Sequence, residues 1–230
     1  MSVILTALFN NFRTKRFLDS LSLINSEDRL LFFVLEDILM NQIIDKIYEI
    51  DHSILLFIQE NCRFEFLTPI MQFSSVLVNA GLLWIILCFI LICFKKTRVM
   101  GLVALSSLAF CFLITNVLLK NLIARARPFD NYNDLVPLIK KPTDFSFPSG
   151  HTTASFATVG VLVRFLNKPL IAVTVIYAFL VAFSRLYLGV HYPSDVLCGM
   201  LIGICGSCLI YFLYSKKFDL KKYKLSRHEE

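Results

Sequence analysis

The chain has 230 residues, of which 57% are hydrophobic and only 17% are charged, and its formal net charge at pH 7 is +6. An average soluble domain is about half apolar and about a quarter charged, so this composition excludes an ordinary soluble protein and indicates an integral membrane protein. The basic residues are divided between short loops and a tail instead of forming one face, which argues against nucleic acid as a partner.

Residues 1–65 are predicted to form an N-terminal amphipathic, interfacial region. The stretch 27–60 carries a charged residue every turn or two between apolar residues at helical spacing, a pattern that cannot span a bilayer. It is expected to lie on the membrane, with packing on a helical bundle or binding of a partner as alternatives. The first 17 residues place apolar residues before basic ones, the wrong order for a secretory signal.

Residues 66–215 are predicted to form one transmembrane domain, because a bilayer core of about 30 Å requires roughly 20 apolar residues in a helix. The expected spans are 81–94, which an interfacial segment from residue 66 precedes, and then 99–119, 152–166, 169–184 and 196–214. The predicted fold class is therefore all-α, a polytopic membrane bundle of about five to six transmembrane helices with N-terminal amphipathic helices. Residues 216–230 form a basic tail.

Basic residues in the short loops predict the orientation of the bundle. Lys95, Lys96 and Arg98, then Arg164 and Lys168, and finally the basic tail fall on one side, which the positive-inside rule makes cytoplasmic. A bacterial cytoplasmic membrane is the expected location. The opposite, extracytoplasmic side nevertheless carries six basic residues, which are Lys120, Arg125, Arg127, Lys140, Lys141 and Arg185. These need a separate explanation.

Three of these cations are suited to holding a phosphate. Lys120 and Arg127 are seven residues apart, so a helix that continued to Pro128 would place them on one face, and Arg185 ends a later span. Together they would repel one another unless a phosphate dianion compensated them, with arginine offering two parallel donors and lysine a point charge. Snorkelling towards lipid headgroups explains any one of them but explains all three poorly.

Two histidine motifs lie on the same side. Pro148-Ser149-Gly150-His151 leads into a span, so backbone N–H groups and the positive end of the helix dipole are expected at Ser149 and Gly150. His191 and Asp195 are four residues apart at the start of the last span. The carboxylate is expected to fix the tautomer of His191 and to leave its other ring nitrogen as a nucleophile.

These residues predict a phosphoryl-transfer site. His191 attacks phosphorus, the cations and the Ser149–Gly150 backbone stabilise the equatorial oxygens, and His151 protonates the leaving oxygen and then activates water. Six of the seven cysteines lie in apolar runs, so neither disulfides nor a metal site is expected, although Cys205 and Cys208 have CxxC spacing.

The three motifs, Lys120-x6-Arg127-Pro128, Pro148-Ser149-Gly150-His151 and Ser184-Arg185-x5-His191-x3-Asp195, resemble the signature of the type 2 phosphatidic acid phosphatase superfamily. The resemblance implies an all-helical core and a metal-independent phosphatase reaction. It also implies that His191 is the nucleophile, that Asp195 orients it and that His151 is the acid. Phosphate binding falls to Lys120, Arg127, Ser149, Gly150 and Arg185.

The expected function is hydrolysis of a lipid phosphate or diphosphate, with the lipid held in the bilayer and no nucleic acid partner. Transfer of the phosphoryl group to a lipid or glycolipid hydroxyl is an alternative, because the intermediate does not dictate what attacks it. A vanadium haloperoxidase and a non-catalytic scaffold that binds phosphate headgroups are two further alternatives. The loop 130–144 is a candidate lid that selects the headgroup.

Overall fold

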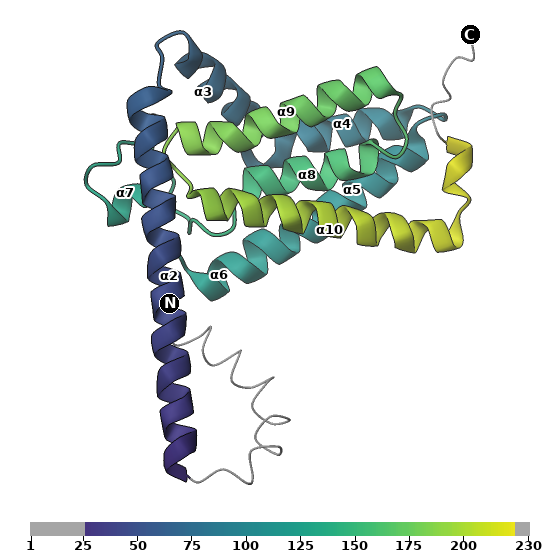
Figure 1. Cartoon of the computed structure of the whole chain (residues 1–230). Coiled ribbons are helices and arrows are strands. Elements are labelled where there is room, and N and C mark those ends of the chain that lie inside the picture. The colour runs from purple at the N-terminus through teal and green to yellow at the C-terminus, as the bar shows by residue number, and fades with distance from the viewer. Residues whose placement is uncertain (1–25, 224–230) are drawn as a thin grey trace.

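A computed structural model describes residues 26–223 of the chain (Figure 1). Within that range every regular element is a helix, as the composition predicts. The elements are α2 (Ser26–Asn61), α3 (Leu67–Leu77), η1 (Asn79–Gly81), α4 (Leu82–Cys93), α5 (Arg98–Phe112), η2 (Leu113–Leu119), α6 (Lys120–Ile123), α7 (Pro128–Asn131), α8 (Gly150–Leu162), α9 (Lys168–Tyr187), α10 (Pro193–Lys217) and η3 (Leu220–Tyr223).

The helix α8 forms the centre of a bundle that also contains α4, α5, α9 and α10 (Figure 1). Most of its side chains are buried, and many of them are small or hydroxylated. Gly203 of α10 allows the backbones of α8 and α10 to approach, because a Cβ added there would lie only 2.8 Å from backbone atoms of Thr153 and Ala157. Close contact through small residues is typical of helices that associate in lipid.

The number of long apolar helices is smaller than the five to six spans predicted. In residues 26–223, three stretches are long and apolar enough to cross a membrane, Arg98–Asn131, Lys168–Tyr187 and Pro193–Lys217. A fourth is the pair Leu67–Leu77 and Asn79–Cys93, bent by 45°. The bend lies where Ala80 and Gly81 take positive φ values of 52° and 74°. The predicted span 152–166 corresponds to α8, which has only 13 residues.

The segment that carries the first cations departs from the predicted helix. It continues from α5 through the wider turn of η2 into α6, but α6 ends at Ile123, where Ala124 takes a left-handed conformation with φ of 48°. The expectation of a helix reaching Pro128 was therefore wrong. Arg127 lies instead in extended backbone immediately before α7.

The two ends of the bundle differ in character. The α4–α5 link, the α8–α9 link and the end of α10 lie together at one end, so the basic loops that predicted the orientation do share a side (Figure 1). At the other end, where α8 and α10 begin, the long helix α2 crosses the bundle steeply and extends past it (Figure 1). The side chains of residues 34–43 of α2 are all exposed.

Candidate active site

One cavity of about 1110 Å³ collects most of the predicted site residues at the end of the bundle that α2 crosses. Six of the eight line it: Lys120, Arg127, Gly150, His151, Arg185 and His191. Asp195 lies behind His191, and Ser149 is buried beside the cavity. The structure thus brings together residues that are up to 75 positions apart in the sequence.

The pair formed by His191 and Asp195 is buried and oriented. The exposed fractions of the two residues are 1% and 0%, and His191 Nδ1 lies 3.4 Å from Asp195 Oδ2. Catalytic hydrogen bonds are often this long before a substrate binds. His191 Nε2 lies 3.4 Å from Arg127 Nη1, which can donate only, so Nε2 carries the lone pair and faces the cavity wall that holds the cations.

The start of α10 holds Asp195 in place. Pro193 is the first helical residue, a position that proline favours, and Asp195 is the third. Its Oδ2 accepts a hydrogen bond from the backbone N–H of Tyr192 at 2.9 Å and another from the hydroxyl of Ser146. A carboxylate in the first turn therefore caps its own helix and positions the histidine that precedes it.

Lys120 and Arg127 meet at the carboxylate of a loop residue that none of the three motifs includes. Asp144 pairs through one oxygen with Lys120 Nζ and through the other with Arg127 Nη2, the latter at 2.7 Å. Lys120 and Arg127 are buried, whereas the Asp144 side chain is 54% exposed on a loop. Asp144 stands between the two cations where a phosphate oxygen would be expected.

The pKa of Asp144 reflects this position. Partial burial acts to raise it, but the hydrogen bond and charge of Lys120 and the charge of Arg127 outweigh burial and hold the pKa well below the ordinary aspartate range. The carboxylate therefore stays ionised throughout the physiological pH range.

Arg185 provides the third cation, and the described part of the chain shows no carboxylate paired with it. One terminal nitrogen donates to the hydroxyl of Ser75, and its buried Nε has no hydrogen-bond partner in that part. A buried guanidinium with spare donors is costly unless an anion completes it. Arg185 lines the same cavity as Lys120 and Arg127.

The start of α8 contributes less than the sequence predicts. The backbone N–H of Ser149 donates to the carbonyl of Asp195 at 3.1 Å, and its hydroxyl accepts from Thr152 at 3.0 Å. Ser149 therefore ties α8 to α10, and the structure does not place it in the cavity wall. Gly150 does line the cavity, where a Cβ would lie 2.9 Å from Oδ1 of Asn116, a residue that η2 carries.

The remainder of the cavity wall is largely apolar. Beyond the cations and histidines, its lining includes Val76, Ile85, Leu105, Leu108, Phe112 and Leu113. Charged and apolar surfaces therefore face one another across one space, which suits a molecule with a phosphate at one end and hydrocarbon at the other. In residues 26–223, no group of three or more His, Cys, Asp or Glu side chains is arranged to hold a metal ion.

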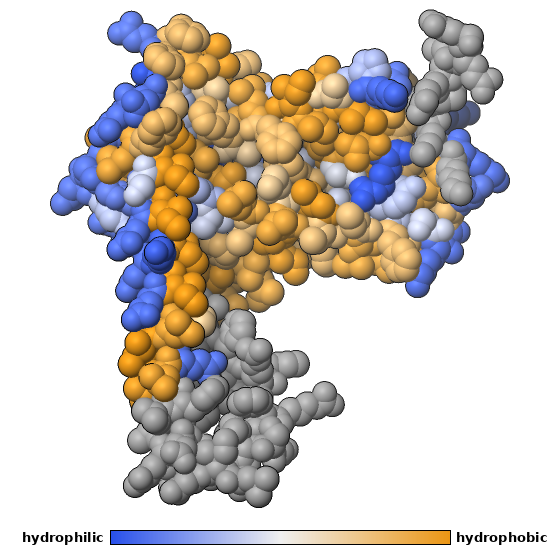
Figure 2. Space-filling model, viewed as in Figure 1, coloured by the Kyte–Doolittle hydropathy of each residue, from blue (hydrophilic) through white to orange (hydrophobic). Residues whose placement is uncertain are grey.

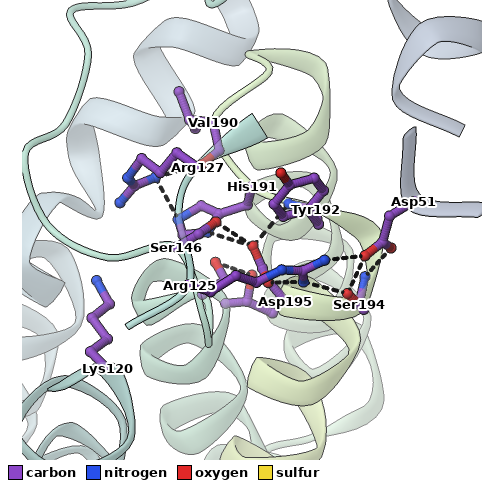
Figure 3. Close-up of polar contacts among 12 residues, drawn as sticks. Asp51, Lys120, Arg125, Arg127, Ser146, Val190, His191, Tyr192, Ser194 and Asp195 are labelled. Atoms are coloured by element: carbon purple, nitrogen blue, oxygen red, sulfur yellow. Dashed lines mark hydrogen bonds and ion pairs between the residues drawn. The ribbon is translucent and has the colours of Figure 1, made fainter. Parts of the chain in front are cut away.

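A second network lies behind Asp195 (Figure 3). Arg125 donates from Nη1 to Asp195 Oδ1 at 2.6 Å and from Nη2 to Asp51 Oδ2 at 2.7 Å, and all three side chains are buried. Its guanidinium carbon lies 4.5 Å from the ring centre of Tyr48 and 3.8 Å from that of Tyr192. Arg125 is one of the six basic residues on the predicted extracytoplasmic side, but none of the three motifs assigns a role to it or to Asp51.

The fold and the cavity place the chain in a class of helical membrane proteins that have a cationic pocket beside a histidine–aspartate pair. Residues 100–219 match the PAP2 superfamily, and the chain belongs to that superfamily. This confirms the resemblance drawn from the three motifs.

Curated relatives include an undecaprenyl-diphosphatase of Sulfolobus acidocaldarius, 38% identical over 122 residues, and a phosphatidylglycerophosphatase B of Bacillus subtilis, 37% identical over 118 residues. These matches span 52% and 47% of this chain and 58% and 53% of the relatives. The chain therefore covers little more than half the length of each.

Solved structures extend the similarity towards the N-terminus. A transmembrane PAP2 type phosphatidylglycerolphosphate phosphatase from Bacillus subtilis shares 26% identity with a TM-score of 0.61, and the match covers 80% of this chain and 90% of that one. LpxE from Aquifex aeolicus shares 28% identity with a TM-score of 0.58 over 70% of this chain and 93% of that one. Together with the apolar helices, these relatives identify an integral membrane protein.

Proposed function

We propose that the protein is a membrane phosphatase that hydrolyses a lipid phosphate or diphosphate through a phosphohistidine intermediate. The observation that carries the proposal is a cavity that joins Lys120, Arg127 and Arg185 beside His191 to an apolar wall. The relatives, which include phosphatases of undecaprenyl diphosphate and of phosphatidylglycerophosphate, support a substrate of this kind.

Binding begins with an exchange of anions. The phosphate takes the place of the Asp144 carboxylate between Lys120 and Arg127 and fills the free donors of Arg185. A dianion with three acceptor oxygens gains more from three cations than one carboxylate does. The loop that carries Asp144 is displaced in the same step, which gives the predicted lid in 130–144 a physical basis.

The first chemical step is attack by His191 Nε2 on phosphorus. Burial, then the charges of Arg127, Arg185 and Lys120, hold the pKa of His191 well below its ordinary value, so its imidazole is unprotonated at neutral pH. A nitrogen–phosphorus bond forms as the bond to the leaving oxygen breaks. His151 takes up a proton once the bound phosphate offsets the charges of Lys120 and Arg185 beside it, and it gives that proton to the leaving oxygen. The imidazolium charge developing on His191 is stabilised by Asp195.

The second step returns the enzyme to its starting state. His151, now neutral, removes a proton from water, the resulting oxygen attacks phosphorus, and the nitrogen–phosphorus bond breaks. Inorganic phosphate leaves and Asp144 pairs again with Lys120 and Arg127. A lipid or glycolipid hydroxyl in place of water gives the transferase alternative with the same residues.

The topology we propose places this chemistry at the extracytoplasmic face. The basic links and the start of the basic tail lie at the opposite end of the bundle, where the positive-inside rule places the cytoplasm (Figure 1). We count α8 as a further crossing: it is short, but α5, α9 and α10 surround it, so lipid need not match its length. With the bent pair this makes five crossings.

We assign α2 to the same membrane surface, in keeping with an interfacial region in residues 1–65. Figure 2 shows an apolar strip along α2 on the side of the lipid-facing bundle surface and hydrophilic residues on the opposite side. An exposed stripe at spacings of three and four residues makes up this apolar side. Its members are Met40, Ile43, Ile47, Ile50, Ile54 and Phe57.

The test is release of phosphate by the detergent-purified protein in EDTA, from phosphatidate, phosphatidylglycerophosphate and a polyprenyl diphosphate. A folded His191→Ala variant is assayed beside it. Release that disappears in the variant supports the proposal, and release that persists there overturns the phosphohistidine mechanism. Loss of substrate without free phosphate, with a new phosphorylated lipid, identifies the transferase alternative instead.

A further inference from the structure

The helix α2 contributes a buried carboxylate to the network behind the candidate nucleophile. Asp51 lies outside the residues that match the family and is only 2% exposed. It accepts from Arg125 Nη2 at 2.7 Å, from the backbone N–H of Ser194 at 2.9 Å and from the Ser194 hydroxyl. The two bonds from Ser194 connect the α2 helix directly to the first turn of α10, and the third connects it to Arg125 in the segment after α6.

Arg125 is shared between two carboxylates. Its Nη1 donates to Asp195 Oδ1 at 2.6 Å and to the Ser194 hydroxyl at 2.7 Å, while Nη2 is committed to Asp51. The rings of Tyr48 and Tyr192 lie close to the guanidinium carbon, at 4.5 and 3.8 Å from their centres. Asp195 Oδ2 therefore remains available to Ser146, to Tyr192 N–H and to His191.

This division matters because an unrestrained guanidinium prefers two parallel bonds to one carboxylate. If Nη2 had no other partner, Arg125 would rotate to take both oxygens of Asp195. It would then compete for Oδ2, the oxygen that faces His191 Nδ1. The imidazole would lose the contact that selects its tautomer, and a misdirected nucleophile loses rate without losing substrate binding.

We propose that Asp51 is a positioning residue: by holding Nη2 of Arg125, it keeps Asp195 Oδ2 free to orient His191. The proposal rests on the proposed function, in which His191 is the nucleophile. Under this proposal α2, which precedes the residues that match the family, contributes a side chain that positions the nucleophile.

Asp51→Asn is the informative substitution, because asparagine keeps the size and can still accept from Ser194, but it removes the charge that holds Arg125. We expect kcat to fall about tenfold to a hundredfold, as for other small displacements of a reacting group, with KM changed less than about twofold. The Asp51→Glu variant is expected to recover part of the rate because it restores the charge.

Gln59→Ala is the matched control. Gln59 also attaches α2 to the rest of the chain, since its amide donates to the carbonyl of Asp134 at 2.8 Å and accepts from the N–H of Val136 at 2.9 Å, but it does not contact Arg125. We expect wild-type kcat from this variant. An equal loss of kcat in Gln59→Ala and Asp51→Asn would show that general docking of α2 matters, which overturns the specific role of Asp51.

A measurement without turnover separates this proposal from the proposed function. The chain has only four histidines, so nitrogen-15 NMR of labelled histidine can report the tautomer of His191, with the His191→Ala spectrum as the assignment. One fixed tautomer protonated at Nδ1 in wild type, lost in Asp51→Asn, supports the role even if the tested lipids are not substrates. An unchanged tautomer in the folded variant overturns it, whatever the wild-type activity.

Discussion

The two halves of the candidate site are held in different ways. On the nucleophile side, Asp195 is completely buried and accepts from Arg125, Ser146 and Tyr192 N–H in addition to facing His191. On the phosphate side, Lys120 and Arg127 share one exposed carboxylate, and Arg185 has no acidic partner in the described part of the chain. One half is complete without substrate, whereas the other depends on an anion that can be exchanged.

The difference follows from what each half does in the proposed reaction. A nucleophile gains rate from being oriented before substrate arrives, so its supporting bonds are buried and numerous. Cations gathered for a dianion would repel one another in its absence, and a replaceable carboxylate relieves that repulsion. Substitutions in the first half are therefore expected to act on kcat, and those in the second on substrate affinity as well.

The largest effect is expected for Asp195→Asn. The amide can present its N–H to His191 Nδ1, which selects the tautomer with the proton on Nε2 and removes the attacking lone pair. Loss of the carboxylate also leaves Arg125 with Asp51 as its one carboxylate partner among the described residues. We expect kcat to fall by about 10³ to 10⁴, as tautomer errors do in histidine–aspartate sites, with little change in KM. Steady-state kinetics with a soluble short-chain lipid phosphate checks this, and a dominant rise in KM would contradict the division between the halves.

A smaller loss is expected for Arg127→Lys, which keeps the charge. Arg127 uses its three nitrogens separately, donating from Nε to the Asp144 carbonyl at 2.9 Å, from Nη1 to the Val190 carbonyl at 2.5 Å and from Nη2 to Asp144 Oδ1. A lysine cannot reproduce this geometry. We expect kcat/KM to fall about tenfold to a hundredfold with a clear share in KM. Equal kcat/KM in Arg127→Lys and the unsubstituted enzyme would show that a positive charge alone is sufficient at position 127.

A gain in affinity is expected for Asp144→Asn, because the competing charge is removed. Phosphate and vanadate should inhibit several-fold more tightly, by roughly the 1 kcal/mol typical of a partly exposed charge pair. The pKa of Asp144 is depressed, so its contact with the cations is present above its unfolded value and would be lost only at strongly acid pH. The difference in inhibition should therefore stay constant between about pH 5 and pH 8, and weaker inhibition of the variant would contradict the exchange of anions.

The same contrast explains what the sequence could predict. Lys120, Arg127, Arg185, His151, His191 and Asp195 each have a chemistry suited to phosphoryl transfer at fixed spacing, and all but Asp195 reach the cavity itself. The helical fold followed from long apolar stretches. The early end of α6 could not be predicted, because alanine at position 124 does not indicate a left-handed conformation in the sequence.

Residues that act through partners were beyond sequence reasoning. Asp51 is one of many acidic residues in an amphipathic stretch, and only the fold shows it buried against Arg125. Asp144 looks like an ordinary loop residue until Lys120 and Arg127 are found on either side of it. Ser149 was expected to donate to phosphate, but the approach of α8 to α10 gives its N–H to Asp195. Such contacts depend on tertiary distances that no local pattern encodes.

The smallest effect on activity is expected for substitutions in the part of α2 that we assign to the bilayer surface. Ile47→Trp lies on the exposed apolar stripe and Asp45→Trp on the opposite face of the helix; both are made with Trp84→Phe, which removes the one native tryptophan. In vesicles with brominated acyl chains, the tryptophan fluorescence of the Ile47→Trp variant should be strongly quenched and that of the Asp45→Trp variant weakly. The activity of both variants should stay within about twofold of the Trp84→Phe parent. Equal, weak quenching together with crosslinking between copies through the stripe would assign that face to a second chain. In that case Asp51 would link the nucleophile to a subunit interface and not to the lipid surface.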